Sequence, residues 1–366
     1  MPDPRISKLA KVLVQYSLDL QPGEQFVLRT SPLAEDLNLE VYKEAILAGA
    51  HVTLQVGLPG SAEIFFKNAS DAQLDYISPI RRLVTETFDA SLYIEAEHNT
   101  RELSGVNPER QSLFSRANAE ISKIFLERAA KKELKWSLTV FPTHAMAQEA
   151  DMSLKEYQEF VYNAGMLHLD DPVAFWKKEG QRQREIISWL EGREQVIVKG
   201  NNVDLSFSIK DRTFEPADGK YNFPDGEIFT GPVEESANGH IRFSYPAIYG
   251  GQEVEDIELW FENGKVIKEK ASKGNELLTT LLNTDDGARY LGEWGIGTNY
   301  GIQRFTKNML FDEKIGGTIH LAVGAGYPET GSKNDSGIHW DMLCDMAESE
   351  ITVDGDLMYK DGKFVV

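Results

Sequence analysis

The first half of the chain alternates between short apolar segments and longer segments with helical spacing. Residues 24–30 (EQFVLRT) resemble a strand, residues 34–50 place apolar side chains at helical intervals, and residues 51–57 (HVTLQVG) alternate apolar and polar positions. Together they predict a β-α-β unit with parallel strands and a right-handed crossover. Further elements of this region are strands at 89–97 and 134–143 and a long helix at 108–132.

The second half of the chain has a different pattern. After Gly192 the segments become short and β-rich, and the pairs Asn201-Asn202 and Asn263-Gly264 are typical of hairpin turns. Residues 275–283 (NELLTTLLN) predict one helix among these strands. The pattern therefore indicates two regions of different fold class.

A helical stretch joins the two regions. Ser153 and Glu156 fit a capping box at its start, and residues 171–192 continue the helical spacing. We expect an α/β fold in which an N-terminal α/β domain, with a partly parallel sheet and a helical extension, spans residues 1–190. A C-terminal β-rich α+β domain is expected over residues 191–366.

Composition and charge narrow the possible partners. The chain has 366 residues, of which 41% are hydrophobic and 26% charged, as is usual for a globular protein. Its formal net charge of -20 repels phosphate backbones and anionic membranes. No apolar run reaches the roughly 18 residues that a membrane span requires. We expect no nucleic-acid and no membrane partner.

Two features bear on location. The N-terminal residues lack the apolar core and small-residue cleavage site of a signal peptide, and they predict an amphipathic helix instead. Cys344 is the only cysteine, so no disulfide can form within the chain, which suits a reducing compartment. We expect a cytoplasmic protein.

Candidate metal ligands collect in the C-terminal half, where carboxylates and histidines stand among glycines and apolar residues. A buried carboxylate or imidazole is costly unless a partner or a metal compensates it. The segments are FPDGEIFTGP with Asp225 and Glu227, LGEWGIGTN with Glu293, FDEKIGGTIHLAVGAGYPETG with Glu313, His320 and Tyr327, and SGIHWDM with His339 and Asp341.

The spacing of His339 and Asp341 allows two interpretations. Side chains two residues apart on a strand point to the same face, so this pair could offer a nitrogen and an oxygen to a metal, with Trp340 pointing into the core. An ordinary buried polar pair explains the spacing equally well. His320 alone is more typical of a core histidine, and the carboxylates alone of turns.

Motifs of other enzyme classes do not fit. The segment GYPETGSK resembles a phosphate-binding loop, but Ser332 precedes Lys333 instead of following it. The chain contains no H-E-x-x-H, no G-x-S-x-G, and no G-x-G-x-x-G after the first strand. These observations argue against a P-loop protein, a zincin, an α/β-hydrolase and a nicotinamide-binding protein.

Taken together, several long segments resemble the M29 family of metallo-aminopeptidases. They are NFPDGEIFTGPVE, LGEWGIGTN, EKIGGTIHLAVGAGYPETGSKNDSGIHWDM and the closing DGDLMYKDGKFV, and the resemblance extends over the whole chain. It implies an N-terminal α/β domain, a C-terminal catalytic domain that holds two divalent metal ions, and a homodimer. It also implies removal of N-terminal amino acids from peptides that have a free N-terminus.

The resemblance also assigns roles to single residues. Glu293 would bridge the two ions, Glu313 would act as general base or further ligand, and Tyr327 would assist catalysis. The implied ions are zinc, cobalt, manganese or magnesium. The implied metal ligands are Glu227, Glu293, His320, His339 and Asp341.

Such a site has a known chemistry. Two metals roughly 3.5–4 Å apart share a carboxylate, lower the pKa of a bridging water and polarise the scissile carbonyl. Two alternatives remain at this point: a dinuclear-metal phosphoesterase, and a non-catalytic relative that binds metal or peptide. The first is disfavoured because only Arg289 and Arg304 lie near the motifs. The preferred N-terminal residue of a substrate does not follow from the sequence.

Overall fold

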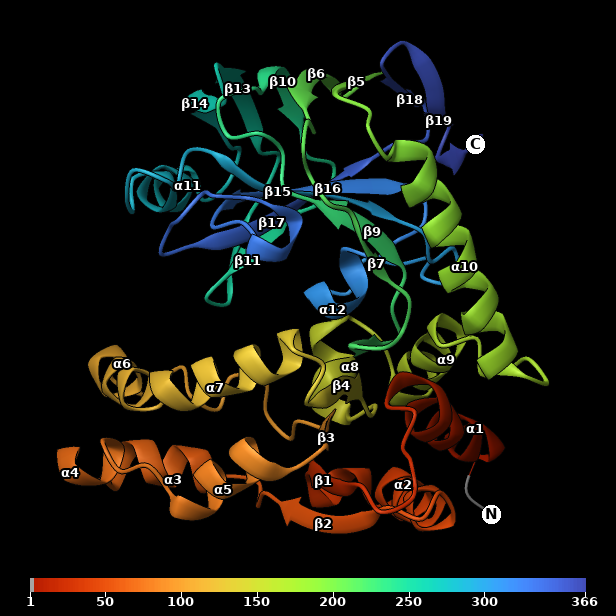
Figure 1. Cartoon of the computed structure of the whole chain (residues 1–366). Coiled ribbons are helices and arrows are strands. Elements are labelled where there is room, and N and C mark those ends of the chain that lie inside the picture. Colours follow the sequence, from red (N-terminus) through yellow and green to blue (C-terminus); the bar gives the residue numbers. More distant parts are fainter. Residues whose placement is uncertain (1–2) are drawn as a thin grey trace. The chain divides into compact units, whose positions relative to one another are not determined.

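The computed structural model describes residues 3–366 (Figure 1), and the chain divides into two compact units. The N-terminal unit comprises the chain up to Ala174 together with Gly219–Pro224. The C-terminal unit comprises Phe175–Asp218 and Asp225–Val366. The expected domain boundary at residue 190 stays a prediction, because a compact unit is not by itself an independently folding domain.

The N-terminal unit is built on a five-stranded parallel sheet in the order β2-β1-β3-β4-β8. The predicted β-α-β unit is confirmed, since helix α2 (Glu35–Leu47) connects β1 to β2. The strands are β1 (Gln25–Thr30), β2 (His51–Val56), β3 (Ala90–Glu95), β4 (Lys135–Val140) and β8 (Asn222–Phe223).

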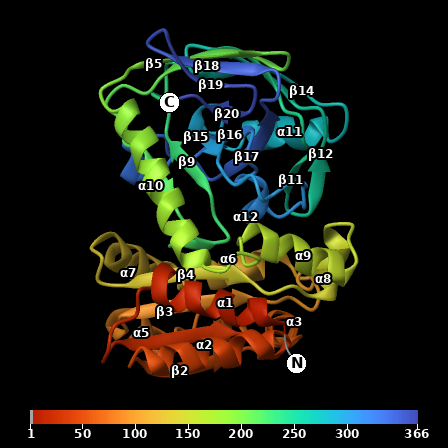
Figure 2. The same cartoon turned by 90° about the vertical axis from the view of Figure 1, so that its right-hand side faces the viewer.

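Helices cover both faces of this sheet, with α1 and α2 on one face and α3 to α7 on the other (Figures 1 and 2). The long helix predicted over 108–132 is in fact two helices that meet at Asn118, whose buried side chain hydrogen-bonds the Phe114 carbonyl. The helices are α1 (Pro4–Val12), α2 (Glu35–Leu47), α3 (Ser61–Asn68), α4 (Asp71–Leu74), α5 (Pro79–Thr87), α6 (Pro108–Ala117), α7 (Ala119–Ala130), α8 (His144–Glu149) and α9 (Leu154–Ala164).

The middle of the parallel sheet is its apolar core. Phe26, Val27 and Leu28 follow one another in β1, and all three are fully buried. A strand with helices on both faces needs apolar residues at consecutive positions, and the run FVL supplies them. Strand β2 lies at the edge of the sheet, and it is correspondingly more exposed.

The C-terminal unit contains two antiparallel sheets and a short hairpin. The larger sheet has the order β14-β13-β10-β6-β5-β18-β19-β20, the smaller β17-β16-β15-β9-β7, and β11 pairs with β12. The strands are β5 (Gln195–Gly200), β6 (Val203–Ser208), β7 (Glu215–Ala217), β9 (Glu227–Thr230), β10 (Asn238–Arg242), β11 (Ala247–Tyr249), β12 (Gln252–Val254), β13 (Glu258–Glu262), β14 (Lys265–Lys270), β15 (Leu291–Gly297), β16 (Thr318–Gly324), β17 (His339–Asp345), β18 (Ser349–Val353), β19 (Asp356–Lys360) and β20 (Lys363–Phe364).

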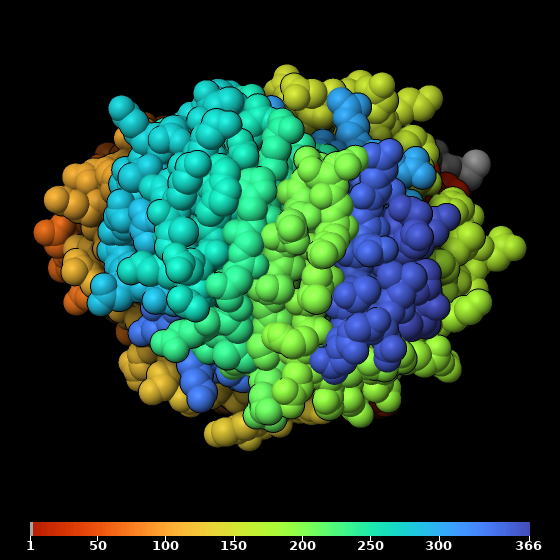
Figure 3. Space-filling view, turned by 90° about the horizontal axis from the view of Figure 1, so that it is seen from above, coloured from red at the N-terminus to blue at the C-terminus, as the bar shows by residue number. Residues whose placement is uncertain are grey.

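The two sheets share one hydrophobic core. Phe207 of β6 and Trp294 of β15 meet in it, with ring centroids 5.0 Å apart. Figure 3 shows the other face of the larger sheet, where strands coloured from teal through green to blue lie side by side. The predicted hairpin turn at Asn263-Gly264 is confirmed, since both residues have the positive φ that this turn requires.

Three helices complete the C-terminal region: α10 (Pro172–Leu190), α11 (Asn275–Leu282) and α12 (Met309–Asp312). Helix α11 confirms the helix predicted at 275–283. Within residues 3–366, the structure contains no helix with the length and apolarity that crossing a membrane would demand.

Candidate metal centre

The smaller sheet of the C-terminal unit has one apolar face and one polar face, because successive side chains of a strand point to opposite sides. The apolar face belongs to the core and carries Trp294, Ile296, Leu321, Val323, Trp340 and Met342. The polar face, here called the site face, carries Glu227 of β9, Glu293 of β15, His320 of β16, and His339 and Asp341 of β17. The structure thus brings all five predicted ligand residues onto one face.

A β-bulge at Gly292 directs Glu293 to the site face. Leu291 pairs with Val323 and Glu293 pairs with Ala322, so the register shifts by one residue between them. Without this shift, Leu291 and Glu293 would share a face. A Cβ at Gly292 would lie 2.2 Å from the carbonyl oxygen of Ala325, just after β16, so only glycine fits the bulge.

Small residues make room for the ligand side chains. His320 pairs with Gly295 of the next strand, and its ring lies over that residue. A Cβ at Gly295 would lie only 2.0 Å from the His320 ring. Ala322 separates Asp341 from Glu293 in the same row. The glycines of GEWGIG therefore allow close packing of the neighbouring segments.

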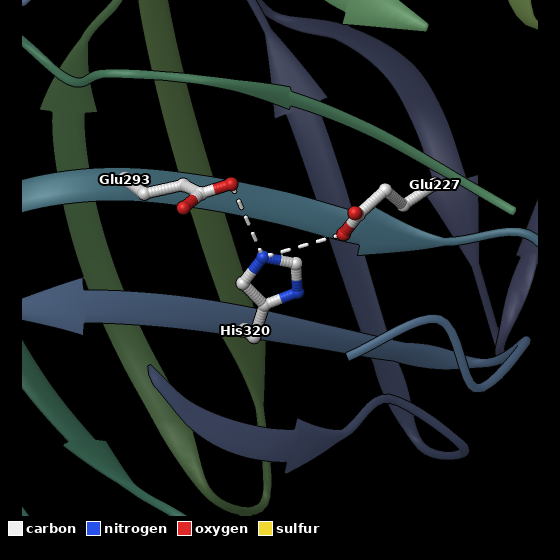
Figure 4. A group of neighbouring side chains, drawn as sticks. All are labelled: Glu227, Glu293 and His320. Atoms are coloured by element: carbon white, nitrogen blue, oxygen red, sulfur yellow. Dashed lines mark ion pairs between the residues drawn. The ribbon is translucent and has the colours of Figure 1, made fainter. Parts of the chain in front are cut away.

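Glu293 lies between the two histidines. Its Oε1 is 3.5 Å from His320 Nε2, and its Oε2 is 3.1 Å from His339 Nε2. Figure 4 shows that His320 Nε2 also faces Glu227, whose Oε2 lies 3.5 Å away. On the other side, His339 Nε2 is 3.5 Å from Asp341 Oδ2. One carboxylate therefore connects two clusters of side chains.

Backbone carbonyls orient both imidazole rings. Nδ1 of His320 lies 3.2 Å from the Glu313 carbonyl oxygen, and Nδ1 of His339 lies 2.7 Å from that of Ala325. A carbonyl can only accept a hydrogen bond, so Nδ1 carries the proton in both rings. The Nε2 atoms are then the ones that face the carboxylates, an arrangement typical of metal-binding histidines.

The charged groups of the cluster strongly influence one another. Burial opposes ionisation of Glu293, but hydrogen bonds with His320 and His339 outweigh it and lower its carboxyl pKa to about 2. Burial also opposes protonation of the imidazoles. The carboxylates that surround them nevertheless raise the pKa of His320 to about 10 and that of His339 to about 11. In the absence of an ion, imidazole protons therefore supply the positive charge that the carboxylates require.

The residues fit divalent ions. Glu227 Oε2 and Asp341 Oδ1 are buried without a hydrogen-bond partner among the described residues, which leaves each oxygen in need of a cation. Imidazole nitrogens with carboxylate oxygens form a donor set suited to divalent transition metals. These residues form two sets that share Glu293. Within each set, every residue has one ligand atom within 4.8 Å of the ligand atoms of the other two residues. The sets are Glu227, Glu293 and His320, and Glu293, His339 and Asp341.

Lys314 and Asp225 also belong to this cluster, and sequence reasoning missed Lys314. The Lys314 side chain is fully buried, and its Nζ contacts Glu313 Oε1, lies 3.5 Å from Glu227 Oε1 and lies 3.9 Å from Asp225 Oδ1. These carboxylates outweigh the effect of burial and raise the pKa of the lysine, so it carries a positive charge. Its only sequence signal is a lysine between an acid and the apolar IGG, which is too common to single out.

Glu313 and Tyr327 lie beside the ligand residues. Glu313 follows helix α12, and burial raises the pKa of its carboxyl although Lys314 opposes this shift. The Tyr327 ring centroid is 5.1 Å from that of His339. Tyr327 is 40% exposed, and partial burial with the nearby charges of Glu293 and Asp341 raises the pKa of its hydroxyl, which therefore keeps its proton and can donate a hydrogen bond.

Comparisons with known proteins identify the relatives of this chain and its fold. A relative from Geobacillus stearothermophilus, aminopeptidase 2, is 26% identical, with 98% of this chain and 95% of the relative aligned. Aminopeptidase T from Thermus thermophilus is also 26% identical over the same shares. The solved structure of AmpT from Thermus thermophilus covers 99% of both chains at 24% identity, with a TM-score of 0.84. The expected fold class, α/β followed by a β-rich region, is confirmed.

A second solved structure shows that the fold alone does not determine chemistry. A 2,5-dihydroxypyridine dioxygenase from Pseudomonas putida covers 100% of this chain at 13% identity, with a TM-score of 0.57. Family membership rests instead on the sequence. The family model described as thermophilic metalloprotease (M29) matches residues 2–364. The chain therefore belongs to the M29 family of metalloproteases.

Proposed function

We propose that the protein is a metal-dependent aminopeptidase that hydrolyses the N-terminal peptide bond at a centre of two divalent ions. Glu227, Glu293 and His320 would hold one ion, and Glu293, His339 and Asp341 would hold the other. The position of Glu293 carries this proposal, because each of its oxygens faces a different histidine, at 3.5 and 3.1 Å. A carboxylate placed in this way is suited to bridging two ions.

The charge of the cluster supports two ions rather than one. Its five carboxylates, when ionised, carry five negative charges, and Lys314 supplies one positive charge, which leaves a surplus of four. Two divalent ions would balance that surplus. The donor set suits zinc, cobalt or manganese, and magnesium is the remaining candidate.

The reaction can be divided between the ions and the protein. Bound divalent ions would polarise the scissile carbonyl and make water a stronger acid. Glu313 accepts a proton from the attacking water and delivers it to the leaving amine, a task that suits a carboxylate of raised pKa. Tyr327 donates a hydrogen bond to the oxygen that becomes negative in the transition state.

Substrates of this enzyme are peptides with a free N-terminus. The centre is rich in carboxylates, and a carboxylate that contacts the α-ammonium would restrict hydrolysis to the first peptide bond. Two relatives, from Bacillus subtilis and Streptococcus thermophilus, also have the name aminopeptidase, at 23% and 24% identity. Their names support the proposed activity and do not identify the preferred N-terminal residue.

A substrate comparison tests the proposed reaction class. The enzyme is assayed with amino-acid p-nitroanilides and with p-nitrophenyl phosphate, each with and without added cobalt or zinc. We expect metal-dependent release of nitroaniline and no release of phosphate. Metal-dependent phosphate release would favour a phosphoesterase, and the absence of both activities would favour a non-catalytic relative.

Glu313→Gln tests the proposed general base. We expect this variant to keep its full metal content and to lose at least about a hundredfold in kcat, the usual contribution of a general base. Glu276→Gln, an exposed change on helix α11, is the matched control and should keep full activity. Unchanged turnover in Glu313→Gln at full metal content would contradict the assignment.

We also propose a homodimer in the cytoplasm. The dimer follows from the family resemblance, and the single cysteine, Cys344, suits a reducing compartment. Light scattering after size-exclusion chromatography should give twice the mass of one chain, and fractionation should recover the protein with cytoplasmic markers. A monomeric mass would contradict the first proposal, and recovery with exported proteins the second.

A further inference from the structure

The N-terminal unit contains a cavity that the proposed function does not use. It has a volume of about 770 Å³ and is lined by the residues that end β1, β2 and β3 and by the loops that follow these strands. Its size lies within the range of small-molecule sites, roughly 300–1,000 Å³. Polar and apolar groups both contribute to its wall.

The cavity lies where the strand order of the parallel sheet reverses. Strand β1 lies between β2 and β3, and the chain goes first to β2 on one side and then to β3 on the other. The loops after β1 and β3 therefore diverge and leave a crevice at the carboxyl ends of the strands. Open α/β sheets generally bind their ligands in this crevice.

Arg29 offers a guanidinium to this cavity. It is the penultimate residue of β1, partly buried, and its Nε donates a hydrogen bond to Gln55 Oε1 at 3.3 Å. Within residues 3–366 it forms no ion pair, and burial together with the positive charge of Arg81 lowers its pKa. Its two Nη atoms remain available as hydrogen-bond donors. A guanidinium with free donors can bind both oxygens of a carboxylate.

Glu97 offers a carboxylate to the same cavity. It stands just after β3, is partly buried, and has neither a hydrogen bond nor an ion pair among the described residues. Its neighbour Glu102 is different, since it accepts a hydrogen bond from the Glu63 amide and lies 3.8 Å from His98. Burial and the charge of Glu102 raise the pKa of Glu97, as expected for a carboxyl without a cation.

A cation and an anion thus line one cavity without pairing with each other. We propose that the cavity binds a zwitterion, an amino acid or a short peptide, with its carboxylate on Arg29 and its ammonium on Glu97. Apolar side chains such as Val56 and Leu58, which are 49% and 70% exposed, contact the rest of the ligand. This binding site is separate from the metal centre in sequence, and the proposal does not depend on aminopeptidase activity.

The test measures peptide binding when the metal centre cannot act on the peptide. Calorimetry uses the full chain with Glu293→Gln, and the probes are Leu-Gly-Gly, its N-acetyl form and its C-terminal amide. We expect Leu-Gly-Gly to bind and each blocked form to bind about tenfold more weakly, the usual effect of losing one charged hydrogen bond. Equal binding of all three forms would overturn the proposal.

Second substitutions assign each end of the ligand. Arg29→Gln should weaken binding of Leu-Gly-Gly about tenfold and leave binding of the amide unchanged. Glu97→Gln should weaken binding of Leu-Gly-Gly and of the amide, and leave binding of the acetylated form unchanged. Arg29→Lys keeps the positive charge but cannot donate two parallel hydrogen bonds, so it should give an intermediate loss of binding affinity. Arg82→Gln and Glu86→Gln, which break exposed ion pairs on α5, are matched controls and should bind normally.

Three further outcomes would contradict the site. One is the absence of binding at concentrations of about 5 mM. Another is inorganic phosphate that binds as tightly as the peptide, which would indicate an anion site on Arg29 alone. The third is normal binding by both Arg29→Gln and Glu97→Gln. Because hydrolysis is never measured, these results are independent of whether the enzyme is an aminopeptidase.

Discussion

Both units contain a five-stranded sheet, but they carry polar groups at different places on it. In the parallel sheet of the N-terminal unit, strands have helices on both faces, so Glu97 and its polar neighbours lie after the strand ends. In the antiparallel sheet of the C-terminal unit, His320 and Glu293 lie inside the strands. The second arrangement is possible because only one face of that sheet belongs to the core.

The difference determines how firmly each group is held. Inside a ladder, paired backbone on both sides fixes the direction of a side chain, and substitutions of its small neighbours are poorly tolerated. After a strand end, the loop backbone is less constrained and the side chains are less paired. We therefore expect the metal centre to be sensitive to single atoms and the cavity to tolerate conservative changes.

The pKa values of buried and partly buried carboxyls also differ between the two regions. Glu293 is buried against two imidazoles, and its pKa falls to about 2. Glu95, at the end of β3, is partly buried beside Glu97 without a cation, and its pKa rises to about 7. Glu293 thus has cationic partners within the fold, whereas Glu95 and Glu97 form no ion pair among the described residues.

The largest expected effect follows from removing the shared carboxylate. Glu293→Gln should lose bound metal and reduce kcat/KM more than about a thousandfold, which corresponds to roughly 4 kcal/mol. Metal analysis and p-nitroanilide kinetics measure both. Retention of two ions with normal kinetics would show that Glu293 is not the bridge.

Removing the buried ammonium should mainly affect stability. Lys314→Met leaves the carboxylates of Glu227, Glu313 and Asp225 without their cation, and we expect the metal-free protein to lose about 3 kcal/mol. Added zinc should raise the melting temperature more in this variant than in the wild type, because the ions replace the lost charge. Equal melting temperatures without metal would contradict this role.

A single methyl group should distinguish the two regions. Gly295→Ala places a Cβ against the His320 ring, and we expect a loss of about a hundredfold in kcat/KM together with weaker metal binding. Gly105→Ala in the N-terminal unit, where a Cβ meets nothing within 4 Å, is the control and should have little effect. Equal effects of the two substitutions on kcat/KM and on metal binding would contradict this expected difference between the two regions.

Loss of one hydroxyl should have a smaller effect. Tyr327→Phe keeps the ring beside His339, so metal content and KM should not change, while kcat should fall about tenfold or somewhat more. Steady-state kinetics at saturating metal measure the two parameters separately. A rise in KM at unchanged kcat would assign Tyr327 to substrate binding instead of transition-state stabilisation.

The smallest effect is a pH dependence in the N-terminal unit. Burial raises the pKa of Glu95 from 4.5 to about 7, so between these values the folded state retains a proton that the unfolded state loses. The free energy of unfolding should therefore fall as pH rises from about 5 to 7 and then level off. Glu95→Gln should lack this decline, on the order of 1–2 kcal/mol in urea unfolding. The same dependence of the unfolding free energy on pH in the wild type and in Glu95→Gln would contradict this role of Glu95.

Much of this structure could be predicted from local sequence patterns. Alternating and helical spacing identified β1, α2 and β2, and the Asn263-Gly264 turn was recognisable from its residues. The β-rich region after residue 192 was also evident. Patterns of this kind reflect which positions are buried within one element, and neighbouring residues determine them.

Features that depend on distant contacts could not be predicted. The bulge at Gly292 reverses the face of Glu293, and strict alternation from Leu291 gives the opposite result. Lys314 owes its role to carboxylates up to 89 positions away in the chain, such as Asp225. The helix break at Asn118 depends on a buried side chain. Family resemblance named the ligand residues, and their role as ligands stays a prediction.

The most direct test of the account is anomalous diffraction from metal-loaded crystals, recorded at the absorption edge of the added metal. We expect two peaks that share Glu293, one beside Glu227 and His320 and the other beside His339 and Asp341, with ligand distances of about 2.0–2.2 Å for zinc. A single peak, or peaks not in contact with Glu293, would contradict the proposed two-ion centre.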